Sequence, residues 1–67
     1  MYKVSIDCWD IITLEFIGWK EYFESYDDAI EYFRKSVIEY LEFEAEIYLV
    51  DCDNNDVISE FRAVARN

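Results

Sequence analysis

The sequence predicts an α+β domain of the order ββαββ, in which an antiparallel sheet carries one helix packed on one face. Three observations predict this architecture. Hydrophobic and polar residues alternate over residues 2–8, as they do in a half-buried strand. Apolar residues recur at helical spacing between residues 26 and 43, and two apolar runs separated by turn-forming residues follow. The 67 residues are expected to form a single domain, 1–67.

The first half of the sheet is expected to consist of two strands. Residues 2–8 form the first strand, and a turn is expected near Trp9 and Asp10. The second strand lies within residues 11–23, where apolar residues alternate again. Gly18 interrupts this segment and predicts a bulge or bend, which leaves open whether the segment is one bent strand or two.

The helix is predicted to begin after Ser25, a preferred N-cap residue, and to run from Tyr26 to Phe43. Asp27 and Asp28 place negative charge in its first turn, where the helix dipole favours anions. At 100° per residue, one stripe of apolar residues is expected to face the sheet. The stripe comprises Tyr26, Ile30, Phe33, Val37 and Leu41, flanked by Ala29 and Tyr40.

The second half of the sheet is predicted to be a hairpin. Residues 45–52 and 57–65 form its strands, and the turn formers at 53–56 join them. Alternation along the last strand places Val57 and Phe61 on the same face.

One face of this sheet has no helix to cover it. Ile17, Tyr48 and Val50 are expected to be exposed there. An uncovered apolar face predicts a homodimer as one alternative for the assembly of this protein.

The formal net charge is −10, from sixteen acidic and six basic residues. Such a charge opposes direct binding to nucleic acid and to anionic membrane surfaces, and it favours a basic protein partner. Two interpretations of the charge stay open: it attracts a basic partner, or it only keeps a small hydrophobic protein soluble. No segment is long and apolar enough for a transmembrane helix.

Catalytic and cofactor signatures are missing from the sequence. There is no histidine and no glycine-rich phosphate loop, so we expect a protein that is not an enzyme and binds no cofactor. The segment beginning at Asp51 resembles the start of an EF-hand calcium loop. Its sixth position is Asp56 rather than glycine and its twelfth is Arg62 rather than glutamate, so a polar turn without metal is expected. Weak surface binding of a cation by Asp51, Asp53 and Asp56 is the alternative.

The two cysteines, Cys8 and Cys52, lie far apart and no secretory signal precedes them. Reduced thiols in a cytoplasmic protein are the simplest expectation, and a single disulfide is the alternative.

The helix surface is the remaining candidate site. Carboxylates three or four residues apart on a helix lie roughly 5–6 Å apart at Cβ, a spacing comparable to that of successive phosphates. Lys35 interrupts this row, as it would on an ordinary solvated helix. Tyr32, and Trp19 on the second strand, could offer flat surfaces for arginine stacking. The expected partner-binding residues are Asp28, Glu31, Tyr32, Glu39 and Glu42.

In size, charge and α+β pattern, the chain resembles the small acidic inhibitors of phages and mobile elements, which include anti-CRISPR proteins and other DNA mimics. The resemblance rests on no shared motif. It implies a protein that docks on the basic nucleic-acid channel of a nuclease or CRISPR effector in a bacterial host cell. The alternative is a small structural or regulatory module that homodimerises through its apolar sheet face.

Overall fold

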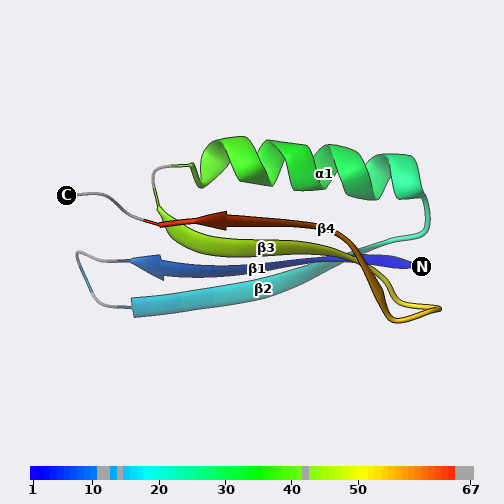
Figure 1. Cartoon of the computed structure of the whole chain (residues 1–67), viewed down its shortest axis with the longest axis horizontal. Helices are drawn as coiled ribbons and strands as arrows, with labels where there is room; N and C mark the ends of the chain where they lie inside the picture. The colour runs from blue at the N-terminus through cyan, green and yellow to red at the C-terminus, as the bar shows by residue number, and fades with distance from the viewer. Residues whose placement is uncertain (11–12, 14, 42, 65–67) are drawn as a thin grey trace.

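The computed structural model describes residues 1–10, 13, 15–41 and 43–64 of the chain. The sheet order is β2-β1-β3-β4, and every neighbouring pair of strands is antiparallel. The helix lies on one face of this sheet, so the predicted ββαββ fold is confirmed (Figure 1). The elements along the chain are β1 (Tyr2–Asp10), β2 (Glu15–Phe23), α1 (Tyr26–Glu39), β3 (Glu44–Asp51) and β4 (Asp56–Ala63).

β1 is longer than the alternation alone predicted. The turn expected near Trp9 and Asp10 is wrong, because both residues continue the strand and pair with Phe16 and Glu15 of β2. Trp9 also pairs with Glu44 of β3, so strands on both sides hold it in extended conformation. Of the segment 11–23 predicted for the second strand, residues 11, 12 and 14 lie outside the described residues.

Gly18 lies in the middle of β2 without a bulge or bend, which corrects the prediction. It pairs with Asp7 in an unbroken register, and its φ is not in the left-handed region. A Cβ atom at this position would lie 3.0 Å from Oδ1 of Asp7 and 3.2 Å from Cε1 of Phe16. The glycine therefore makes space for two side chains and provides no unusual backbone geometry.

The helix begins where the sequence predicts and ends earlier. The hydroxyl of Ser25 accepts a hydrogen bond from the N–H of Asp28 at 3.5 Å, as an N-cap does. The helix ends at Glu39, not at Phe43, and the N–H of Tyr40 closes its last turn on the carbonyl of Ser36. The ring of Tyr40 packs on Trp19 and Phe43, with centroids 5.7 and 5.8 Å away, and β3 begins directly after Phe43. Tertiary packing therefore overrides a helical pattern that continues in the sequence.

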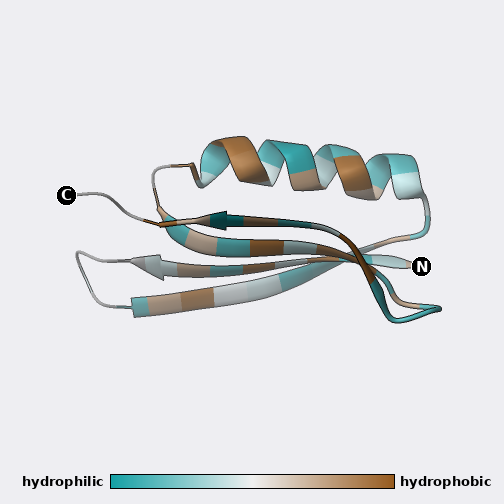
Figure 2. Ribbon diagram, in the orientation of Figure 1, coloured by the Kyte–Doolittle hydropathy of each residue, from teal (hydrophilic) through white to brown (hydrophobic). Residues whose placement is uncertain are grey.

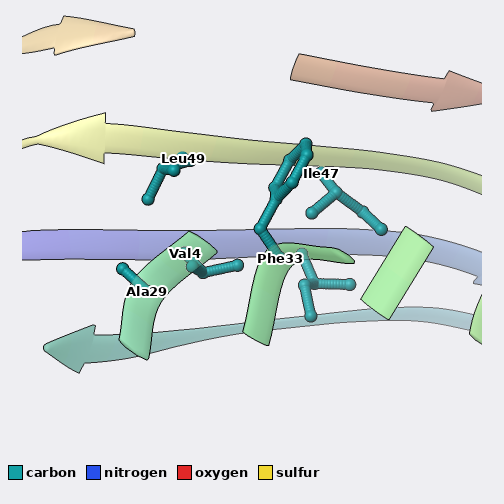
Figure 3. Packing of buried hydrophobic residues seen from close by; sticks show 6 residues of the cluster. Val4, Ala29, Phe33, Ile47 and Leu49 are labelled. Atoms are coloured by element: carbon teal, nitrogen blue, oxygen red, sulfur yellow. The ribbon is translucent and has the colours of Figure 1, made fainter. Parts of the chain in front are cut away.

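The core lies between α1 and the sheet (Figure 3). Phe33 of the predicted stripe and the flanking Ala29 are buried, whereas Tyr26 and Leu41 of the stripe are 42% and 56% exposed, which corrects their assignment to the core. Ser36 is buried instead, and its hydroxyl donates a hydrogen bond to the carbonyl of Tyr32 at 2.8 Å. The central cluster consists of Val4, Ile6, Ala29, Phe33, Ile47 and Leu49.

The β3–β4 hairpin turns through residues 52–55, and Figure 2 shows this turn as strongly hydrophilic. Asn55 adopts a φ of 58°, a left-handed conformation that asparagine tolerates well. The register shifts between Leu49 and Val50, so that Val57 pairs with Val50 while Phe61 pairs with Ile47. Val57 and Phe61 therefore lie on opposite faces, contrary to the prediction, because a bulge reverses the alternation between them.

The two cysteines lie at opposite ends of the sheet and are not joined in a disulfide. Cys8 is buried on the helix side, opposite Ala45 of β3. Cys52 is exposed in the hairpin turn, where its N–H donates a hydrogen bond to the carbonyl of Met1.

Candidate functional site

The negative charge of the chain is not neutralised by internal pairing in the described residues. Of the sixteen acids, fourteen have side chains that the structure describes, all except Asp10 and Glu42, and none of these fourteen is buried. Three of the fourteen form ion pairs: Glu31 with Lys35 at 3.1 Å, Glu46 with Arg62 at 3.0 Å, and Asp53 with the amino group of Met1 at 3.0 Å.

The predicted carboxylate row on the helix is present in part. Asp28, Glu31 and Glu39 are all exposed on α1. At a rise of about 1.5 Å per residue, Asp28 and Glu39 stand roughly 16 Å apart along the helix axis. Lys35 is paired with Glu31 and adds a positive charge to the row. The fourth predicted carboxylate, Glu42, lies outside the described residues.

Tyr32 does not lie on the outward face of the helix, which corrects the prediction of a surface anchor. Its ring is half-buried and packs on Phe23 of β2, with ring centroids 5.2 Å apart. The indole N–H of Trp19 donates a hydrogen bond to the Tyr32 hydroxyl at 3.2 Å. Trp19 is itself half-buried under the helix, so neither ring is the exposed platform that the sequence suggested.

The fold gathers acids at one end of the molecule that sequence reasoning did not group. The start of α1 and the β3–β4 turn lie at this end, beside the N-terminus (Figure 1). Tyr2 links the two segments, because it pairs with Asp51 and packs edge-on against Tyr26, with ring centroids 5.6 Å apart. We name this surface the acidic end, and its acids are Glu24, Asp27, Asp28, Asp51, Asp53 and Asp56.

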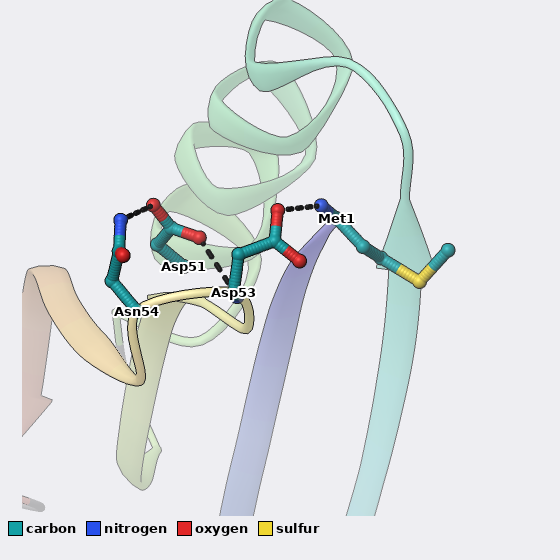
Figure 4. Close-up of polar contacts among 4 residues, drawn as sticks. All are labelled: Met1, Asp51, Asp53 and Asn54. Atoms are coloured by element: carbon teal, nitrogen blue, oxygen red, sulfur yellow. Dashed lines mark hydrogen bonds and ion pairs between the residues drawn. The ribbon is translucent and has the colours of Figure 1, made fainter.

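Hydrogen bonds organise the hairpin half of the acidic end (Figure 4). The carboxylate of Asp51 accepts from the N–H of Asp53 at 3.0 Å and from Nδ2 of Asn54 at 3.2 Å. The Met1 ammonium donates to Asp53, and this contact raises the pKa of the amino group above its ordinary value of 8.0. The described residues include no group of acids or cysteines arranged to hold a metal ion. The hydrogen bonds of Asp51 and Asp53 tie the turn to itself and to the N-terminus.

The sheet face that points away from α1, named here the open face, has a different character from the helix side. It carries four acids and three bases, whereas the other described side chains include ten acids and two bases. Charge on the molecule is therefore asymmetric: the helix side and the acidic end are anionic, and the open face is nearly balanced. The residues of the open face are Lys3, Ser5, Asp7, Trp9, Phe16, Gly18, Lys20, Tyr22, Glu44, Glu46, Tyr48, Val50, Val57, Glu60 and Arg62.

Two of the three apolar residues predicted for this face lie on it. Tyr48 and Val50 are there and are half-buried among their neighbours. Ile17 is exposed, but it pairs with the buried Cys8 and lies on the helix side, so its predicted placement is wrong. Dimerisation through the open face stays a prediction.

A hollow of about 260 Å³ opens on the open face, at the end of the sheet opposite the acidic end. Trp9 and Phe16 form an aromatic wall of the hollow, and Glu46 and Arg62 lie on its other side; Ala45, Ala63 and Val64 add apolar surface. Sequence reasoning missed this feature, because only the strand register brings these residues together.

Comparison of the chain with models of protein families, with curated proteins and with solved structures found no match. Within the described part of the chain, no helix has the length and apolar character needed to cross a membrane. The function of this protein must therefore be inferred from its surface.

Proposed function

We propose that this protein is a non-enzymatic inhibitor that occludes a basic, nucleic-acid-binding surface on a larger protein. The observation that carries the proposal is the uncompensated charge. Fourteen described acids face solvent fully or in part, and three of them form ion pairs. A protein with a net charge of −10 is attracted to lysine- and arginine-rich surfaces and repelled by phosphates.

The docking surface of the proposal is the outward side of α1 together with the acidic end. Asp28 belongs to both, Glu31 follows one turn later, and Glu39 lies near the helix C-terminus. A rigid helix holds these carboxylates at fixed spacing, so their pattern can imitate part of a phosphate row. The partner's bases would bind these carboxylates in place of nucleic acid, and the bulk of the domain would block the channel. Nucleases and CRISPR effectors carry such channels, which is consistent with an anti-CRISPR or DNA-mimic role.

The experiment uses the whole tagged chain as bait in a bacterial lysate, followed by identification of the proteins retained. Each retained protein is purified, loaded with a fluorescently labelled nucleic acid, and titrated with the inhibitor while anisotropy is recorded. We expect release of the nucleic acid, because both ligands compete for one surface. A retained protein that keeps its nucleic acid at saturating inhibitor would contradict the proposal.

Paired charge reversals locate the docking surface. The double variant Glu31→Lys/Glu39→Lys raises the net charge by four and should abolish both retention and release. The matched control, Glu15→Lys/Glu60→Lys, changes the net charge by the same amount at exposed strand positions and should bind almost as well. Equal loss in both variants would show that net charge alone matters, and survival of the helix variant would show that α1 is the wrong site.

A further inference from the structure

The hollow on the open face combines aromatic walls with carboxylates. β1 and β2 supply the aromatic side, and β3 and β4 supply the opposite side at the same end of the sheet. The residues that carry its chemistry are Asp7, Trp9, Phe16, Glu44, Glu46 and Arg62.

Two aromatic rings form a wall that is accessible to a ligand. The rings of Trp9 and Phe16 have centroids 6.3 Å apart and are tilted by 46°, and the two residues are 39% and 59% exposed. Gly18, the one glycine in the sequence, leaves room here for the side chains of Phe16 and Asp7, both of which a Cβ atom at this position would meet. The indole and phenyl faces attract cations through their quadrupoles.

The charge of the hollow favours a cationic ligand. Asp7, Glu44 and Glu46 contribute three negative charges, and Arg62 contributes one positive charge. The guanidinium of Arg62 already has partners within the protein. Its interaction with Tyr48, and to a lesser extent with the carboxylate of Glu46, raises the pKa of Arg62 above the ordinary value. The carboxylates of Asp7 and Glu44 form no ion pair within the described part of the chain, so they are available to a second cation.

We propose that this hollow binds one arginine side chain of a basic partner protein. The guanidinium stacks on Trp9 while Asp7 or Glu44 accepts its N–H groups. Arginine fits better than lysine, because a planar guanidinium can stack and donate two parallel hydrogen bonds at the same time. The inference rests on the proposed function in taking the partner to be basic, but it assigns a second contact on the opposite face of the sheet.

The test is an NMR titration of the ¹⁵N-labelled chain with the blocked peptide acetyl-Gly-Arg-Gly-amide. The sequence has two tryptophans, and therefore two indole N–H signals. Trp9 reports on the hollow, whereas Trp19 lies under the helix and serves as an internal control. We expect a saturable shift of the Trp9 signal with the Trp19 signal unchanged. The citrulline peptide, which is nearly isosteric and neutral, should bind about tenfold more weakly, because it lacks the charge that strengthens each hydrogen bond.

Matched variants separate the site from general attraction to an anionic protein. Asp7→Asn should weaken arginine-peptide binding several-fold, and Trp9→Leu should weaken it while keeping an apolar side chain. Asp28→Asn removes the same charge at the acidic end and should have no effect. Circular dichroism of each variant checks that the fold is retained.

Several results would overturn the proposal: equal binding of the arginine and citrulline peptides, equal loss in Asp7→Asn and Asp28→Asn, or tighter binding of a lysine peptide. A Trp9 signal that moves on dilution without peptide would show that a second copy covers the hollow, and would also overturn it. Because the titration uses no partner protein, its failure leaves the helix-side proposal standing, and a failed lysate experiment leaves the titration result unaffected.

Discussion

The contact between Trp19 and Tyr32 gives the sharpest test of how the helix is attached to the sheet. Tyr32→Phe removes the hydroxyl that accepts the indole hydrogen bond at 3.2 Å and leaves the ring on Phe23. The half-buried indole N–H then loses this partner, which should lower the free energy of unfolding by about 1 kcal/mol. Tyr32→Ala also removes the ring, and because the ring is only half-buried we expect a loss of about 2–3 kcal/mol in total.

The assay is thermal and urea unfolding followed by circular dichroism. For a domain of this size, a change of 1 kcal/mol shifts Tm by roughly 4–8 °C, so both variants are measurable. Tyr22 provides the matched control. It lies on the edge strand β2, its side chain is 56% exposed, and it belongs to the open face. Tyr22→Phe and Tyr22→Ala should change the free energy of unfolding by no more than about 0.5 kcal/mol.

The outcome decides whether Tyr32 is a structural residue or a surface residue. If Tyr32→Ala is no more destabilising than Tyr22→Ala, the ring does not pack between helix and sheet, and the reasoning from this contact is refuted. In that case Tyr32 would be available to a partner, as the sequence alone suggested. A Trp19 indole signal that does not move in Tyr32→Phe would refute the hydrogen bond separately.

Three further predictions concern the helix start, the N-terminus and the overall charge. Ser25→Ala should cost about 0.5–1 kcal/mol in urea unfolding, near the low end for an N-cap because the hydrogen bond is long at 3.5 Å; a cost above about 2 kcal/mol would contradict this reading. The ion pair with Asp53 raises the pKa of the Met1 amino group above 8.0, so its stabilisation is complete below pH 8 and is lost as the pH rises through the raised pKa. When the pH is raised from about 7 to about 9.5, the urea midpoint of the natural chain should therefore decrease, and that of Asp53→Asn should decrease much less. Equal decreases in the two proteins would show that the ion pair contributes nothing to stability. Raising sodium chloride from about 10 mM to about 0.5 M should raise Tm, because salt screens repulsion among uncompensated carboxylates, and a fall in Tm would indicate that attractive pairs dominate.

Local signals in the sequence were sufficient for the element order and for most strand boundaries. The alternation of Val4 and Ile6 with polar neighbours, the N-cap Ser25 and the asparagine-rich turn each act within a few residues. Their structures follow from side-chain chemistry and chain geometry that does not depend on the rest of the fold. The exposed carboxylates Asp28 and Glu39 were predictable for the same reason, because they lie well away from the apolar stripe.

The features that sequence reasoning missed depend on contacts between distant segments. Tyr32 lies only 100° from Phe33 around the helix, so whether it is buried depends on how far β2 extends beneath it. The helix end at Glu39 depends on Tyr40 meeting Trp19 and on where β3 must begin. The acidic end and the hollow could not be predicted for the same reason, because each is formed by elements that only the sheet order places together.

The central claim is that uncompensated carboxylates bring this protein to a cationic surface, and salt dependence of association tests it most directly. The dissociation constant for the partner recovered from the lysate should be measured over a range of sodium chloride concentrations, with Glu31→Lys/Glu39→Lys and Glu15→Lys/Glu60→Lys for comparison. We expect affinity to fall steeply with salt for the natural chain and the strand control, because exposed charges are screened within about 10 Å at 0.1 M. An affinity that hardly changes with salt would contradict the account and favour an apolar interface instead.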